Sequence, residues 1–117
     1  MKTFRFLDFP VYIQARILYK RVLSLTDQFT VYSLKEQLRR AALSVVLNIA
    51  EGSARESDKE FFRFIQLSLG SINEVVACLD VMRSAGLIGE ESFNEMKVDC
   101  EMIAKQLGGL SKKLRTG

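Results

Sequence analysis

One segment of the chain combines polar side chains at helical spacing with an otherwise apolar sequence. Between residues 37 and 51 the polar side chains recur every three or four residues, which places them in one narrow stripe along an α-helix. They are two amides, a guanidinium, a hydroxyl and a carboxylate: Gln37, Arg40, Ser44, Asn48 and Glu51. Apart from Arg39, the rest of the segment is apolar or small. Such a helix is expected to be buried on several sides, so its polar stripe needs partners inside a core or an interface.

The chain lacks the groups that most catalytic sites use. It contains no histidine, which removes the usual general base near neutral pH and the histidines of a di-iron site. No Gly-rich phosphate loop is present. Cys78 and Cys100 lie in apolar helical patterns and are expected to be buried free thiols. The sequence therefore predicts a protein that is not an enzyme and that holds no metal or cofactor.

The polar stripe has a counterpart in the following helical segment, where Ser71 and Glu74 lie one turn apart. We expect the two sets to form a buried hydrogen-bonded network, in which Arg40 pairs with Glu51 or Glu74 within one protomer or between protomers. A second interpretation, that the same groups bind a small ligand, stays open at this point. The predicted network comprises Gln37, Arg40, Ser44, Asn48, Glu51, Ser71 and Glu74.

Basic residues are concentrated in the first half of the chain. The formal net charge is +3, and residues 1–63 hold eleven Lys and Arg against seven Asp and Glu. These side chains either form solvated helix faces or contact phosphates. No helix-turn-helix spacing and no alternation of aromatic and basic residues is present, so nucleic-acid binding would use the backbone rather than the bases. The candidate contacts are Arg16, Lys20, Arg21, Lys59 and Arg63.

Four helical segments account for nearly the whole chain. Apolar residues at spacings of three and four predict helices at about 9–25, 33–51, 57–85 and 90–114. No apolar alternation of period two persists, so no strand is expected. Because the connections are short, neighbouring helices should be antiparallel. The prediction is an all-α, up-down-up-down four-helix bundle that forms a single domain over residues 1–117.

Capping residues and glycines predict where these helices begin and end. The last three helices should begin with capping boxes of the form S-x-x-E, at Ser33, Ser57 and Ser92. Gly52 and Gly86 are expected to end the second and third helices. Gly70 lies in the middle of the third helix, where we expect it to permit a close approach by another helix.

The second helix also predicts self-association. Leu43, Val46, Leu47 and Ala50 lie on more sides of this helix than one bundle core can cover. We therefore expect a closed homo-oligomer. The chain starts with no signal peptide, and no continuous apolar run reaches the ~18 residues of a membrane span. A cytoplasmic protein without membrane contact is the expectation.

Several short motifs match a known pattern. They are Gln37 to Ala42 (QLRRAA), Ser44, Asn48 to Gly52 (NIAEG), Glu60-Phe61, Arg63-Phe64, Gly70-Ser71, Glu74, and Gly86 to Ile88. With these motifs the whole chain resembles the bacterial four helix bundle protein family, which includes proteins encoded in intervening sequences of large-subunit ribosomal RNA genes. The accessory protein of diversity-generating retroelements is related to that family. The chain departs from the family pattern at Tyr12, where Trp is common, and at Pro10 and Ser68.

The resemblance implies a protomer of four helices in a ring-like homopentamer. For the retroelement relative it implies binding to nucleic acid and to a reverse transcriptase, and it implies no defined activity for the intervening-sequence members. Together with the residues, it favours a non-enzymatic oligomeric scaffold that associates with the backbone of RNA or DNA. The alternative is a structural or protein-interaction oligomer without nucleic-acid binding.

Overall fold

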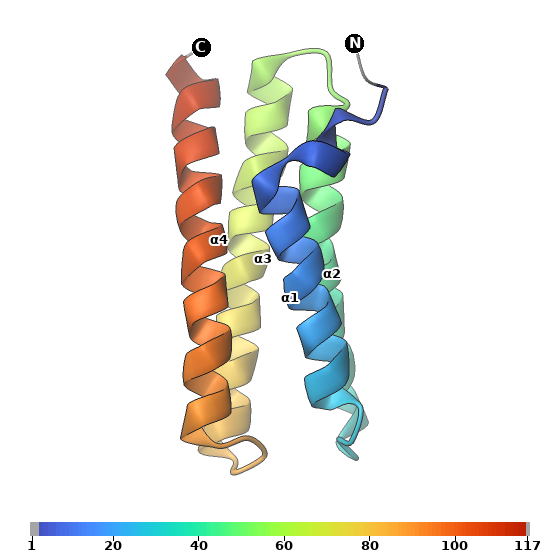
Figure 1. Cartoon of the computed structure of the whole chain (residues 1–117), viewed down its shortest axis with the longest axis vertical. Coiled ribbons are helices and arrows are strands. Elements are labelled where there is room, and N and C mark those ends of the chain that lie inside the picture. The colour runs from blue at the N-terminus through green and yellow to red at the C-terminus, as the bar shows by residue number, and fades with distance from the viewer. Residues whose placement is uncertain (1–2, 117) are drawn as a thin grey trace.

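The computed structural model describes residues 3–116, and it confirms the predicted four-helix bundle (Figure 1). A short 3-10 turn, η1 (Arg5–Asp8), precedes α1 (Pro10–Thr26), α2 (Tyr32–Ser53), α3 (Asp58–Ser84) and α4 (Glu90–Thr116). Residues 3–116 contain no strand. The bundle measures 45 × 23 × 20 Å. The sequence prediction did not include η1.

Consecutive helices are neighbours in this bundle, and α1 also contacts α4. The diagonal pairs α1/α3 and α2/α4 do not contact one another within the described residues. Figure 1 shows the first described residues, the α2–α3 connection and the end of α4 at one end of the bundle. We call this the upper end. The α1–α2 and α3–α4 connections form the lower end.

The core consists of apolar residues at spacings of three and four on all four helices, as the periodicity predicts. The largest fully buried apolar side chains are Leu18 and Val22 on α1, Leu38, Val45 and Ile49 on α2, Ile65, Val75, Leu79 and Met82 on α3, and Ile103 and Leu107 on α4. One buried hydroxyl among them is satisfied, because Ser68 Oγ donates to the carbonyl oxygen of Val45 at 2.8 Å.

Only one of the three predicted capping boxes forms a capping bond. Ser57 precedes α3, and its Oγ accepts a hydrogen bond from the backbone N–H of Glu60 at 3.1 Å. The prediction for Ser33 is wrong, because α2 already begins at Tyr32 and its N-cap residue, Val31, makes no side-chain cap bond. The prediction for Ser92 is wrong for the same reason, because α4 begins at Glu90.

The glycines also divide between confirmed and wrong predictions. Gly86 follows α3 with φ +76°, the left-handed conformation that ends a helix. Gly52 lies inside α2, where a Cβ would stand 2.7 Å from Phe64 Cβ. Its role is therefore a close approach between α2 and α3. Gly70 has the opposite environment: no atom lies within 4 Å of a Cβ built there, so it permits no close approach within the protomer.

Two arginines satisfy carbonyl groups at helix C-termini. Arg5 Nε and Nη2 donate to the carbonyl oxygen of Ser53, the last residue of α2, at 3.1 and 2.9 Å. Arg39 Nε donates to Thr26 Oγ1 at 2.8 Å, and its Nη2 donates to the carbonyl oxygen of Leu23 at 3.3 Å. These bonds tie η1 to the upper end of α2, and α2 to the lower end of α1.

Among the described residues, α3 is one helix whose length and hydropathy match those of a membrane-spanning segment. A third of its most apolar window is buried inside the bundle. A core helix of a bundle meets the same criterion, so this match is weak evidence for a membrane segment.

Candidate functional surfaces

A row of hydrogen-bonded polar side chains joins α2 to α3. Ser44 Oγ and Ser71 Oγ lie 2.8 Å apart. Asn48 Nδ2 donates to the carbonyl oxygen and Oγ of Ser44, at 2.9 and 3.0 Å. Nearer the lower end, Gln37 Nε2 donates to Glu74 Oε2. The structure therefore brings together five of the seven residues of the predicted network, in two separate clusters.

Arg40 and Glu51 stand apart from these clusters. Both are exposed, and neither forms a hydrogen bond or an ion pair with any residue of 3–116. They are eleven residues apart on one helix, roughly 16 Å along its axis, which is too far for an ion pair. Glu74 is exposed and bonds Gln37 instead. The predicted pairing of Arg40 with Glu51 or Glu74 is thus absent within one protomer, and pairing between protomers stays a prediction.

Apolar side chains on α2 and α3 are exposed beside the polar row. Leu43 and Leu47 are 37% and 48% exposed on α2, and Leu67 is 57% exposed on α3. Leu47 and Leu67 lie one turn above the Ser44–Ser71 bond, because the two helices are antiparallel. Val46, which we expected at an interface, is instead buried in the protomer's own core.

We call this surface the α2–α3 face. It comprises Arg40, Leu43, Ser44, Leu47, Asn48, Glu51, Leu67 and Ser71. The half-buried Ala50 lies next to it on α2. Apolar groups lie at its centre, and the unpaired charges of Arg40 and Glu51 lie toward its two ends.

The three basic candidates on α1 have different surroundings. Arg21 forms an ion pair with Asp99 of α4. The guanidinium carbon of Arg16 lies 5.8 Å from the centroid of the Tyr12 ring, and Arg16 is exposed. Lys20 is exposed and has no ion-pair partner within residues 3–116. Arg16 and Lys20 are therefore available to bind an anion, whereas Arg21 is partly neutralised.

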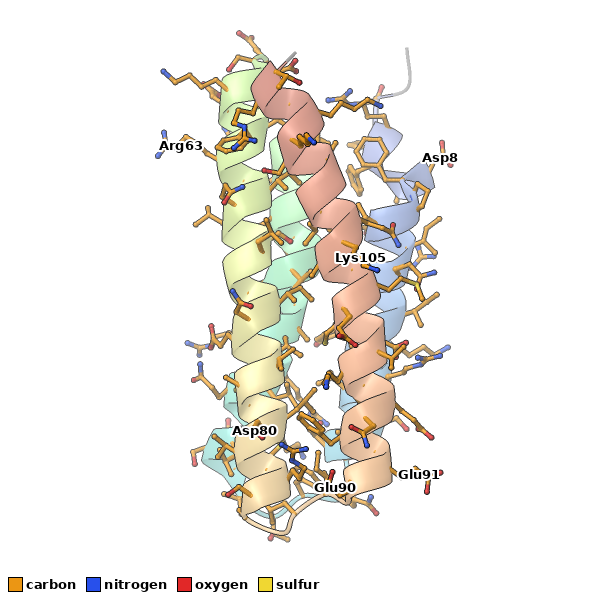
Figure 2. All side chains as sticks on the ribbon, turned by 90° about the vertical axis from the view of Figure 1, so that its left-hand side faces the viewer. Asp8, Arg63, Asp80, Glu90, Glu91 and Lys105 are labelled. Atoms are coloured by element: carbon orange, nitrogen blue, oxygen red, sulfur yellow. The ribbon has the colours of Figure 1, made fainter. Side chains whose placement is uncertain are left out.

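Lys59 and Arg63 are exposed on the first two turns of α3. Figure 2 shows Arg63 pointing outward near the upper end, on the side of the bundle away from α1, whereas Asp80, Glu90 and Glu91 lie near the lower end. Because α1 and α3 are diagonal partners, the five candidates form two separate groups in one protomer rather than one patch.

Two hollows flank the α2–α3 connection at the upper end. The first, of about 300 Å³, is lined by Arg55, Glu60, Arg63, Phe64 and Leu67. The guanidinium carbon of Arg55 lies 4.6 Å from the centroid of the Phe64 ring. The second hollow, of about 620 Å³, is lined by residues 53–58 and by Thr3, Arg5 and Phe61. Arg55 lines both.

The sequence did not predict these hollows. Arg55 lies in a connection and Phe64 lies in a helix, so helical periodicity does not relate one to the other. The contact depends on the turn between α2 and α3, and on the missing Cβ of Gly52, beside which Phe64 packs. The Arg63-Phe64 motif contained the signal, but it did not indicate the geometry.

The thiols are buried and unreactive in character. Cys100 is 1% exposed, and burial raises the pKa of its thiol to about 12, with the charges of Asp99 and Glu101 acting in the same direction. Burial, and then the charge of Glu74, also raises the pKa of Cys78. Within residues 3–116, no group of three or more His, Cys, Asp or Glu side chains is arranged to hold a metal ion.

The model of one protein family matches residues 8–109, and its description is 23S rRNA-intervening sequence protein. The chain belongs to this family. The match confirms the resemblance found in the sequence motifs. No curated protein matches the chain.

A solved structure has the same fold as this family member. It is the crystal structure of a protein of unknown function from the S23 ribosomal protein family of Bacteroides thetaiotaomicron. The two chains are 21% identical and superpose with a TM-score of 0.82, over 87% of the present chain and 98% of the other. At this identity the likeness supports the fold alone.

Proposed function

We propose that this intervening-sequence protein is a non-enzymatic scaffold that assembles into a closed homo-oligomer and binds the backbone of RNA or DNA in the cytoplasm. One observation carries the proposal. The α2–α3 face exposes Leu43, Leu47 and Leu67 beside two unpaired charges of opposite sign. A surface of this composition suits contact with another copy of the chain.

The arrangement of this face supports self-association. A second copy would remove the three leucines from water and bring its own charges against Arg40 and Glu51. An arginine and a carboxylate that are desolvated together need each other as partners, which favours one register over others. The resemblance implies a ring of five protomers, which is the assembly that we propose.

Assembly also multiplies the positive charge. One protomer carries a formal charge of +3, and each added copy contributes the same amount. Arg16 and Lys20 lack ion-pair partners within residues 3–116, as do Lys59 and Arg63. Free cations of this kind bind phosphates by releasing counterions. The ring would present repeated copies of both basic groups to one nucleic acid.

The oligomer is tested by light scattering on wild type and two variants. We expect wild type to have a multiple of the 13.3 kDa protomer mass, and Leu47→Glu to dissociate it while circular dichroism stays helical. Val98→Glu is the matched control, because Val98 is 55% exposed on α4, away from the α2–α3 face. A wild-type mass of one protomer at micromolar concentration would contradict the proposal.

Nucleic-acid binding is tested by titrating labelled RNA and single-stranded DNA at several salt concentrations. Charge reversal at Lys20 and Arg21 should weaken binding to all sequences and flatten the salt dependence, by a slope of ~0.7 per lost contact on single strands. Reversal at Lys97 and Lys105, two exposed lysines of α4, changes the net charge equally and serves as control.

A second pair of variants tests the same contacts in the opposite direction. Asp99→Asn releases Arg21 from its ion pair, so it should strengthen binding. Asp80→Asn removes the same charge from an ion pair with Arg83 at the lower end and should change affinity less. If neither RNA nor DNA binds the intact oligomer at about 50 mM salt, the alternative of a structural or protein-interaction oligomer is favoured, with a reverse transcriptase as the candidate partner that the resemblance implies.

A further inference from the structure

The smaller hollow at the upper end combines a flat apolar surface with two cations. We propose that it holds one nucleotide of a single-stranded nucleic acid, with the base against Phe64 and Leu67 and the phosphate beside Arg55 and Arg63. This inference rests on the proposed nucleic-acid association, and it adds a base contact that backbone binding alone does not require.

The size and lining of the hollow fit a single nucleotide. Its volume of about 300 Å³ lies at the lower end of the range for small-molecule sites. Leu67 is 57% exposed beside the half-buried Phe64, so apolar surface is open to a planar ligand. A base that stacks on this surface gains the contact that aromatic side chains provide in single-strand binding proteins.

The two arginines supply the charge. Arg55 lies 4.6 Å from the Phe64 ring centroid by its guanidinium carbon, so one end of the aromatic surface is next to a cation. Neither Arg55 nor Arg63 forms a hydrogen bond or an ion pair with another side chain of residues 3–116. Their donors are therefore free for phosphate oxygens.

Acidic residues around the hollow limit the attraction. Glu60 lines it, and Glu56 and Asp58 line the neighbouring hollow. The carboxylate of Glu60 can accept a hydrogen bond from a base amino group, such as N6 of adenine. Glu60 therefore suits the base and disfavours the phosphate, which gives the nucleotide one orientation.

The neighbouring hollow offers a path for the strand. Arg55 lines both hollows, so a chain of nucleotides leaving the first would pass Arg55 into the second. That hollow also contains Arg5, which is fixed by its bonds to the Ser53 carbonyl. The strand would cross the α2–α3 connection from one cation to the next.

The test compares two labelled oligomers of equal length by fluorescence anisotropy, one of deoxyadenylate and one with the same backbone but no bases. The intact wild-type protein should bind the deoxyadenylate oligomer about tenfold more tightly, as expected for one stacked base. Arg55→Ala and Phe64→Leu should bring the two affinities together. Circular dichroism and light scattering check that the variants keep their fold and mass.

Arg16→Ala is the matched control, because Arg16 also lies near an aromatic ring but lines neither of the two hollows. It should weaken both oligomers equally and keep their ratio. Equal affinity of the wild type for both oligomers, or an unchanged ratio in Arg55→Ala, would overturn the nucleotide site and leave backbone binding intact. Failure of the wild type to bind either oligomer would instead refute the nucleic-acid association itself.

Discussion

The substitution Gly52→Ala tests the close approach of α2 to α3. A helix-interior Gly→Ala change is normally stabilising by ~1 kcal/mol. Here the added Cβ would meet Phe64 Cβ at 2.7 Å and Phe61 Cδ1 at 2.8 Å. Carbon atoms pack at about 3.5–4.0 Å, so the contact must open by roughly 1 Å. Phe64 Cβ is fixed to the backbone of α3, so no rotamer change relieves the clash.

Forcing α3 away from α2 should cost more than helix propensity returns. Overpacking of this kind costs about 1–3 kcal/mol, which leaves a net loss of about 1–2 kcal/mol. For 117 residues, 1 kcal/mol corresponds to roughly 4 °C in Tm. Gly52→Ala should therefore lower Tm by about 4–8 °C.

Gly70→Ala is the matched control, because it adds the same methyl group where no atom lies within 4 Å. It should raise the stability of the protomer by up to ~1 kcal/mol. The measurement is urea unfolding at a fixed protomer concentration, since assembly shifts apparent stability by mass action. A Gly52→Ala variant as stable as Gly70→Ala would refute the reasoning.

Two further predictions concern a helix cap and a buried thiol. Ser57→Ala should reduce the free energy of unfolding by ~1 kcal/mol, because Ser57 Oγ accepts from the Glu60 N–H, whereas Ser33→Ala should change it little; equal effects in urea unfolding would contradict this. The raised pKa of Cys100 means that the folded state keeps its thiol proton from about pH 9 to about pH 12 while the unfolded state loses it, so stability should fall as pH rises through this window. The loss relative to Cys100→Ala should reach about 1.4 kcal/mol at pH 10, and a pH-independent difference would contradict the burial effect.

Helical periodicity predicted the fold because the core residues follow it without exception on four helices. Helix bounds were less predictable, since S-x-x-E is a cap only when the helix starts after the serine. Ser57 meets this condition, whereas Tyr32 and Glu90 begin their helices earlier than Ser33 and Ser92 allow. The tertiary contacts that decide these starts do not appear in local sequence.

Glycine has the same ambiguity. Gly52 and Gly70 are both helical, and sequence alone assigned the close approach to Gly70 and the helix end to Gly52. The structure reverses the assignment of the close approach, because the neighbour that decides it, Phe64, lies on another helix. The hollow beside Arg55 could not be predicted for a similar reason, since it depends on the path of the α2–α3 connection.

The polar stripe of α2 shows what a single protomer can and cannot satisfy. Ser44 and Asn48 find their partners within the protomer, at the junction with α3. Arg40 and Glu51 follow the same helical spacing but extend beyond that junction, where residues 3–116 offer them no partner. Spacing alone cannot distinguish a stripe that a bundle satisfies from one that needs another copy. The oligomeric state is therefore the first measurement on which the proposed function depends.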